Sequence, residues 1–125
     1  MIGKQIFQIL SGSTGVTKYV STNIYPVIAP QNVSGAYIVY SVTGGINYTK
    51  DGAATGEVSV KIDVLNTDYF EGLVIAKAIF QLMSGKSNYS DTEVTFKSIK
   101  LLDFDEDIFN ENVYVQKQIY SITFV

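Results

Sequence analysis

The sequence predicts an α+β domain in which an antiparallel sheet of about four strands carries two helices on one face. Two segments, 2–10 and 69–83, repeat apolar residues at the spacing of a helix. Other segments alternate apolar with polar residues or form short runs of Tyr, Val and Ile, which is typical of strands. The expected order is α-β-β-α-β-β, because two antiparallel hairpins gather their helices on one face. With 125 residues, the chain fits a single domain spanning 1–125.

The first predicted element is a short helix over 2–10, whose isoleucines follow a helical period and which ends at a Ser-Gly pair. Segment 11–23 is rich in Ser, Thr and Gly and is predicted to be a connection. Pro26 and Pro30 lack amide donors and favour extended conformations in the residues before them. We therefore expect 25–31 to form at most an edge strand.

The centre of the chain predicts a hairpin of two strands. Segment 37–43 is a continuous run of Tyr, Val and Ile with the length of a strand. Segment 58–64 alternates apolar with polar residues and gives the clearest signal for a half-buried strand. Between them, 44–56 contains four glycines and is longer than a tight hairpin needs, so we expect a loop there.

The second helix is predicted over 69–83. Asp68 can cap its first turn through the carboxylate, and Glu71 can return a hydrogen bond in a capping-box arrangement. Gly85 is a natural stop after the last apolar residue.

This helix is apolar over an unusually wide face. Between 73 and 83 only Lys77 and Gln81 are polar, and they lie close together on one narrow strip. A helix that packs on one sheet face does not need so much apolar surface, and a monomer would not leave it exposed. Either the first helix and segment 25–31, which we call the Pro segment, cover this apolar surplus, or another subunit does. The candidate interface residues are Leu73, Val74, Ile75, Ala78 and Leu82.

The last part of the chain predicts two more strands. In 94–104 the apolar alternation changes phase near Ser98, which indicates a bulge. Segment 103–112 is predicted to be an acidic turn, and 113–125 the final strand.

Three acids in this turn, Asp103, Asp105 and Asp107, have the 1, 3, 5 spacing of a calcium loop. The motif also needs Gly at its sixth position and Glu at its twelfth, where this chain has Ile108 and Tyr114. A solvated acidic turn is therefore favoured, and no metal ligand is predicted. The candidate acidic-loop residues are Asp103, Asp105, Glu106, Asp107 and Glu111.

Composition excludes several kinds of site. The chain has no His and no Cys, which removes the usual ligands of zinc, iron–sulfur clusters and haem as well as Ser-His and Cys-His nucleophiles. The net charge of −3 argues against sequence-independent binding of nucleic acid. No apolar run approaches the roughly 18 residues of a membrane span. We therefore predict no cofactor, no catalytic residue and no membrane partner.

Two other functions remain open. A carbohydrate- or ligand-binding module would use tyrosines of the strands as a stacking platform, with Tyr37, Tyr40, Tyr114 and Tyr120 as candidates. An enzyme that uses two carboxylates could draw on any of the twelve acids, and the sequence singles out no pair.

The order of residues resembles the tail-terminator (tail-completion, head–tail joining) proteins of long-tailed bacteriophages and prophages. The resemblance covers about four fifths of the chain and includes IYPVIAPQNVSGAYIVYSV, GEVSVKIDVLNTDYFEGLVIAKAIFQLM and the acidic turn before the last strand. Its most specific pieces are Tyr25-Pro26, Ala29-Pro30-Gln31 and Thr67-Asp68-Tyr69. The family often has Pro before the Tyr/Val strand, whereas this chain has Gly35-Ala36.

The resemblance implies a structural virion protein and no enzyme. Such a subunit forms a homo-hexameric ring on the tail tube protein, ends tail growth and joins the tail to the head completion or connector protein. DNA then passes through the lumen without specific binding. The protein is implied to reside in the tail or neck of the virion, and in the host cytoplasm during assembly. A mobile assembly loop is expected at Asn47, Tyr48, Lys50 and Asp51, and the acidic loop is expected to face the lumen or the head.

Overall fold

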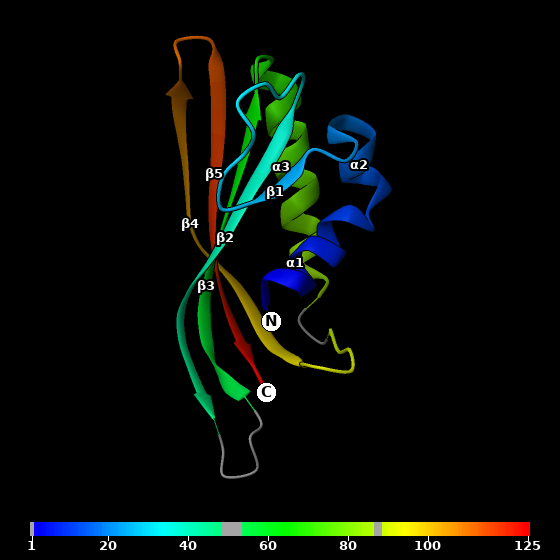
Figure 1. The fold of residues 1–125 in the computed structure, drawn as a ribbon, viewed down its shortest axis with the longest axis vertical. Coiled ribbons are helices and arrows are strands. Elements are labelled where there is room, and N and C mark those ends of the chain that lie inside the picture. Colours follow the sequence, from blue (N-terminus) through cyan, green and yellow to red (C-terminus); the bar gives the residue numbers. More distant parts are fainter. Residues whose placement is uncertain (1, 49–53, 87–88) are drawn as a thin grey trace.

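The computed structural model describes residues 2–48, 54–86 and 89–125, which form three helices and five strands (Figure 1). The elements in chain order are α1 (Ile2–Ser11), α2 (Thr14–Val20), β1 (Ile24–Pro26), β2 (Tyr37–Tyr48), β3 (Ala54–Asn66), α3 (Tyr69–Ser84), β4 (Phe96–Phe109) and β5 (Val113–Phe124). The described helices all lie on one side of a twisted sheet, and we call the other side, which carries none of them, the open face (Figure 1).

The sheet has the strand order β1-β2-β3-β5-β4. β1 pairs in parallel with β2, whereas the other neighbouring strands are antiparallel. The predicted α+β class is therefore confirmed. The finer prediction of four antiparallel strands with two helices is wrong, because the described residues form a mixed sheet of five strands with three helices.

The two extra elements both lie in the first third of the chain. The predicted connection 11–23 contains α2, because Val16 and Val20 are four residues apart and both bury their side chains in the core. The prediction of an edge strand near the prolines is confirmed by β1. β1 is parallel because the chain crosses back between Pro26 and Tyr37 before it enters β2.

Within the predicted loop 44–56, residues 44–48 and 54–56 belong to strands, which corrects the prediction there, and 49–53 lie outside the described residues. β2 and β3 stay paired as far as Tyr48 opposite Ala54, and their ends extend beyond the helices (Figure 1). Gly44 explains part of the error: it has a φ of 137°, and a Cβ added there would lie 2.9 Å from the carbonyl oxygen of Glu57. Glycine therefore permits a close approach of two strands at this point rather than a loop.

The predicted acidic turn 103–112 is also wrong. β4 continues to Phe109, and the turn to β5 is confined to 110–112. Asn110 and Glu111 have positive φ angles of 52° and 69°, which allow this short reversal. The predicted bulge near Ser98 is confirmed by a shift in register between Phe96 and Ser98, and a second shift follows between Leu101 and Asp103.

The core fills the space between the sheet and the helices. The alternation predicted for 58–64 is confirmed, since its four apolar residues are buried and face the helices. The largest fully buried side chains are Tyr120, Phe96, Phe124, Ile6, Leu10, Ile38, Ile62, Ile75, Ile79, Met83, Ile122 and Gln5. No helix in the described residues is both long enough and apolar enough to cross a membrane.

The start of α3 differs from the predicted capping box in one respect. The Asp68 carboxylate accepts a hydrogen bond of 3.1 Å from the Glu71 amide, as predicted. The Glu71 side chain does not return a bond to Asp68. Instead Asn66 accepts from the Asp68 amide at 2.9 Å and donates to the Glu71 carboxylate at 3.0 Å. Asn66 at the end of β3 thus fixes the direction in which α3 begins, and Gly85 ends the helix.

Candidate assembly surfaces

The structure divides the predicted interface residues of α3 among three environments. Ile75 is completely buried, so its assignment to an interface is wrong; it packs in the core. Leu73, Ala78 and Leu82 are half-buried, and Ala78 and Leu82 pack against the core cluster. Only Val74 is exposed, at 48%. The helices α1 and α2 cover most of the apolar surplus, whereas the Pro segment does not, since it lies beside Tyr37 and Leu65 on the face of the sheet opposite to the helices.

One face of α3 nevertheless stays uncovered. We call Phe70, Val74, Lys77 and Gln81 the outer strip of α3; all four are exposed and are spaced three or four residues apart. Phe70 is 74% exposed and sits in the first turn. The two polar residues that the sequence placed on one strip are thus on the solvent side, and two large apolar side chains precede them.

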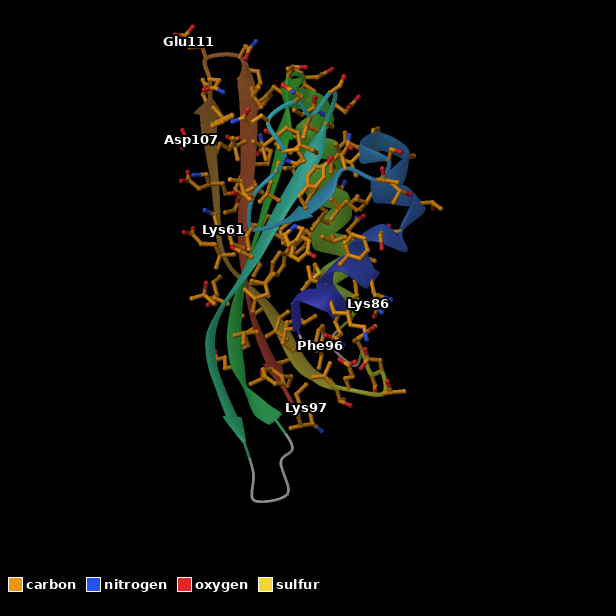
Figure 2. All side chains as sticks on the ribbon, in the orientation of Figure 1. Lys61, Lys86, Phe96, Lys97, Asp107 and Glu111 are labelled. Carbon is orange, nitrogen blue, oxygen red and sulfur yellow. The ribbon has the colours of Figure 1, made fainter. Side chains whose placement is uncertain are left out.

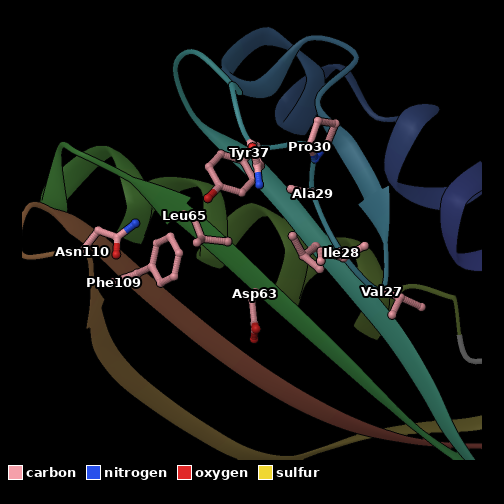
Figure 3. Close-up of a pocket in the computed structure, with 11 residues that line it drawn as sticks. Val27, Ile28, Ala29, Pro30, Tyr37, Asp63, Leu65, Phe109 and Asn110 are labelled. Carbon is pink, nitrogen blue, oxygen red and sulfur yellow. The ribbon is translucent and has the colours of Figure 1, made fainter.

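The open face of the sheet carries a pocket of about 420 Å³. The Pro segment turns over the edge of the sheet at β1 and forms one wall, and strands β2 and β3 form the floor (Figure 3). The pocket is lined by Val27, Ile28, Ala29, Pro30, Gln31, Tyr37, Val39, Asp63, Leu65, Phe109 and Asn110. Its walls are mostly apolar, and Ile28 is 78% exposed, so an apolar group that covered Ile28 would remove apolar surface from water.

A single carboxylate, that of Asp63, lies in this pocket. Figure 3 shows it between Leu65 and Phe109 on one side and Val27 and Ile28 on the other. Burial raises the pKa of Asp63 above its usual value, against the opposing effect of Lys61, whose ammonium lies 3.7 Å from Oδ2. The other carboxylate oxygen, Oδ1, is buried and has no hydrogen-bond partner among the described residues. The pocket therefore combines apolar walls with an acceptor that lacks a donor.

The sequence did not single out this pocket. Tyr37, Asp63 and Leu65 share a face only because β2 and β3 pair in this register, with Tyr37 opposite Leu65. The alternation placed Asp63 on the polar side of the strand, and the strand pattern alone could not show that apolar side chains lie over that side.

The predicted acidic residues lie on the edge strand β4 and in the turn that follows it. Figure 2 shows Asp107 and Glu111 toward the end of the β4–β5 hairpin. Asp103, Asp105 and Asp107 each accept a hydrogen bond of 2.8–2.9 Å from the amide of the next residue. Hydrogen bonding to the Ile108 amide, and then Lys117 at 3.3 Å, lowers the pKa of Asp107.

These acids do not make a metal site. In the parts of the chain that the structure describes, no three acidic side chains converge in a way that could hold a cation. Charge along an exposed edge strand is instead one means by which proteins prevent that strand from pairing with another chain.

The tyrosines do not form a platform. Tyr40 and Tyr120 are buried against the helices, and the phenol of Tyr120 donates a hydrogen bond of 2.7 Å to Gln118. Tyr114, near the start of β5, lies against the first residue of α3, with its ring centroid 5.3 Å from that of Tyr69. Only Tyr37 reaches the open-face pocket. A sugar-stacking surface made of these four residues is therefore excluded by their placement.

The predicted assembly loop is only partly described. Asn47 and Tyr48 belong to the end of β2, which corrects their assignment to a loop. Lys50 and Asp51 lie outside the described residues.

Comparisons with known proteins show which solved structure this fold is similar to. No protein-family model matches the chain, and no curated protein matches it. Among solved structures, it is similar to a chain of one described as "Virion of native gene transfer agent (GTA) particle", with a TM-score of 0.73. The superposition covers 95% of this chain and 90% of that chain, at 12% sequence identity. At so low an identity the likeness concerns the fold. The protein thus shares its fold with a chain of a gene transfer agent virion.

Proposed function

We propose that this chain is a structural subunit of a phage-like virion and acts as its tail terminator. In this role six copies close into a ring on the last ring of the tail tube, stop its growth and join the tail to the head connector, and DNA passes through the lumen. The protein then resides in the tail or neck of the particle after assembly in the host cytoplasm.

The observation that carries the proposal is the fold similarity to a virion chain over 95% of this chain. The resemblance of 24–42 and 56–83 to tail-terminator proteins supports the same role independently, since it rests on the sequence. The described residues also present two exposed apolar side chains on the outer strip of α3, Phe70 and Val74, and a mostly apolar pocket, which suit a protein that assembles.

Two surfaces are proposed to meet other components. The paired ends of β2 and β3, which include Asn47 and Tyr48, extend beyond the helices and are suited to reach the tail tube or a neighbouring subunit (Figure 1). The acids of β4 and Glu111 give one edge of the sheet a negative surface, which would repel DNA in a lumen or face the head.

The test is electron microscopy of the concentrated protein, alone and mixed with the tail tube protein. We expect rings of six copies with a central hole, and tubes capped by such rings. Tubes that grow to the same lengths with and without the protein would contradict the proposal.

A genetic test addresses the joining step. Removal of residues 47–54 is expected to leave a folded protein that no longer joins heads to tails, with circular dichroism as the control for folding. Normal yields of complete particles from this variant would exclude a role for that end of the hairpin.

A further inference from the structure

The outer strip of α3 and the open-face pocket lie on opposite faces of the sheet, near the same end of β3. Leu65 lines the pocket, and the next residue, Asn66, bonds to Glu71 in the first turn of α3. A contact in which the helical side of one copy packs on the open face of the next would therefore bring strip and pocket together, and neither copy would need to shift along its strands.

On both surfaces the apolar side chains lie nearest that end, and a charged side chain lies farther along. On α3 the apolar residues Phe70 and Val74 come first and Lys77 follows, roughly 10 Å from Phe70 at a rise of 1.5 Å per residue. In the pocket Leu65 comes first, and Asp63 follows roughly 7 Å away along the strand. β3 runs toward this end and α3 runs away from it, so the two orders agree when both copies point the same way (Figure 1).

The charges are complementary as well. Lys77 is exposed and takes part in none of the three ion pairs of the described residues. Asp63 pairs with Lys61 through Oδ2, and its other oxygen, Oδ1, is buried without a donor, inside walls that are mostly apolar. An ammonium group on a four-carbon stem reaches such an oxygen while its stem stays on apolar surface.

We propose that the outer strip of α3 docks in the open-face pocket of a second copy of this chain, with Phe70 and Val74 against its apolar walls and Lys77 on Asp63. The inference deepens the proposed function, since it names the surfaces through which copies would join. A contact between two different surfaces repeats from copy to copy and can close into a ring.

Disulfide trapping tests the contact directly, because the natural chain has no cysteine. Val74→Cys and Ile28→Cys are combined in one chain, and the concentrated full-length protein is oxidised. The docking predicts a ladder of disulfide-linked oligomers up to a closed ring. The control combines Ile28→Cys with Thr14→Cys, which lies on α2, and is expected to give no ladder. Absence of the ladder would overturn the proposal. Strong dimers from Val74→Cys alone would overturn it too, because they would mean that α3 packs on α3.

A charge swap then tests the pair. Lys77→Asp and Asp63→Lys are each expected to lower the yield of trapped oligomer about tenfold, which corresponds to roughly 1.4 kcal/mol. The double swap should restore the yield. Because Asp63→Lys adds a third cation near Lys61 and Lys117, Asp63→Asn is measured beside it as a variant that keeps the fold. If the double swap traps no better than the single variants, Lys77 and Asp63 are not partners.

These results separate the contact from the proposed function. Rings in the microscope without a V74C–I28C ladder would leave the terminator role standing and reject this interface. A ladder without rings or tube capping would support the interface and reject the role.

Discussion

The side-chain amide of Gln118 donates a hydrogen bond of 2.9 Å to the backbone carbonyl of Ala76, inside the core. It joins β5 to the middle of α3, between residues that are 42 positions apart. The carbonyl oxygen of the same side chain accepts from Tyr120 at 2.7 Å. A buried Gln is thus satisfied at both ends and orients the helix on the sheet.

Tyr120→Phe is predicted to destabilise the protein by about 1–3 kcal/mol, because it leaves the Gln118 oxygen buried without a donor. Urea unfolding followed by circular dichroism measures the change in the free energy of unfolding. Tyr37→Phe is the matched control: its phenol is half-buried at the pocket, and its loss should cost less. Equal losses from both variants would contradict the role of the buried network.

Ile75→Ala and Val74→Ala are predicted to differ sharply although the residues are adjacent. Ile75 is fully buried, so its truncation should cost about 2–5 kcal/mol. Val74 is 48% exposed, and its truncation should change the stability of the monomer by less than about 0.5 kcal/mol. Thermal unfolding at low protein concentration makes the comparison. Similar losses from both would mean that the whole helix is internal.

Asp63→Asn is predicted to stabilise the isolated monomer at neutral pH. Burial raises the pKa of Asp63 in the folded state, so protonation favours folding below the unfolded pKa of about 3.9, and this contribution is lost as the pH rises through the folded value. At pH 7 the ionised carboxylate therefore lowers the free energy of unfolding, and replacement by Asn removes this destabilisation. Chemical unfolding at pH 7 and at pH 3 should show a gain that shrinks in acid. A gain of the same size at both pH values would exclude the electrostatic cause.

Asp91→Asn is predicted to weaken the protein at neutral pH and to flatten its loss of stability in acid. The Gln5 amide at 2.8 Å, followed by the backbone amides of Glu93 and Val94, lowers the pKa of Asp91. Its contribution is present above the unfolded pKa of about 3.9 and is lost as the pH falls through the folded value. Unfolding midpoints between pH 7 and pH 2 test this, with Thr92→Ser as a neutral control on the same loop. An unchanged pH profile would contradict the assignment.

Several errors made from the sequence have a common physical origin. The glycines of 44–56 and the acids of 103–107 disfavour a strand when each segment is considered alone. The described residues of both segments, 44–48, 54–56 and 103–107, are strand because a long partner satisfies their backbone groups, as Val58 does opposite Gly44 and Lys117 does opposite Asp105. The composition of one segment cannot show such pairing, because the register of the whole sheet decides which residues of two strands lie opposite each other.

The sequence by itself determined the α+β class, the helix over α1, the alternation of β3, the cap of α3 at Asp68 and the bulge near Ser98. These follow from local periodicity and local hydrogen bonding. Only the tertiary structure decided that Ile75 faces the core while Val74 faces water, and that Asp63 lies in an apolar pocket with Tyr37 and Leu65. The reason is that exposure depends on which surfaces the other elements cover, and the helices α1 and α2 and the Pro segment reach those surfaces from distant parts of the chain.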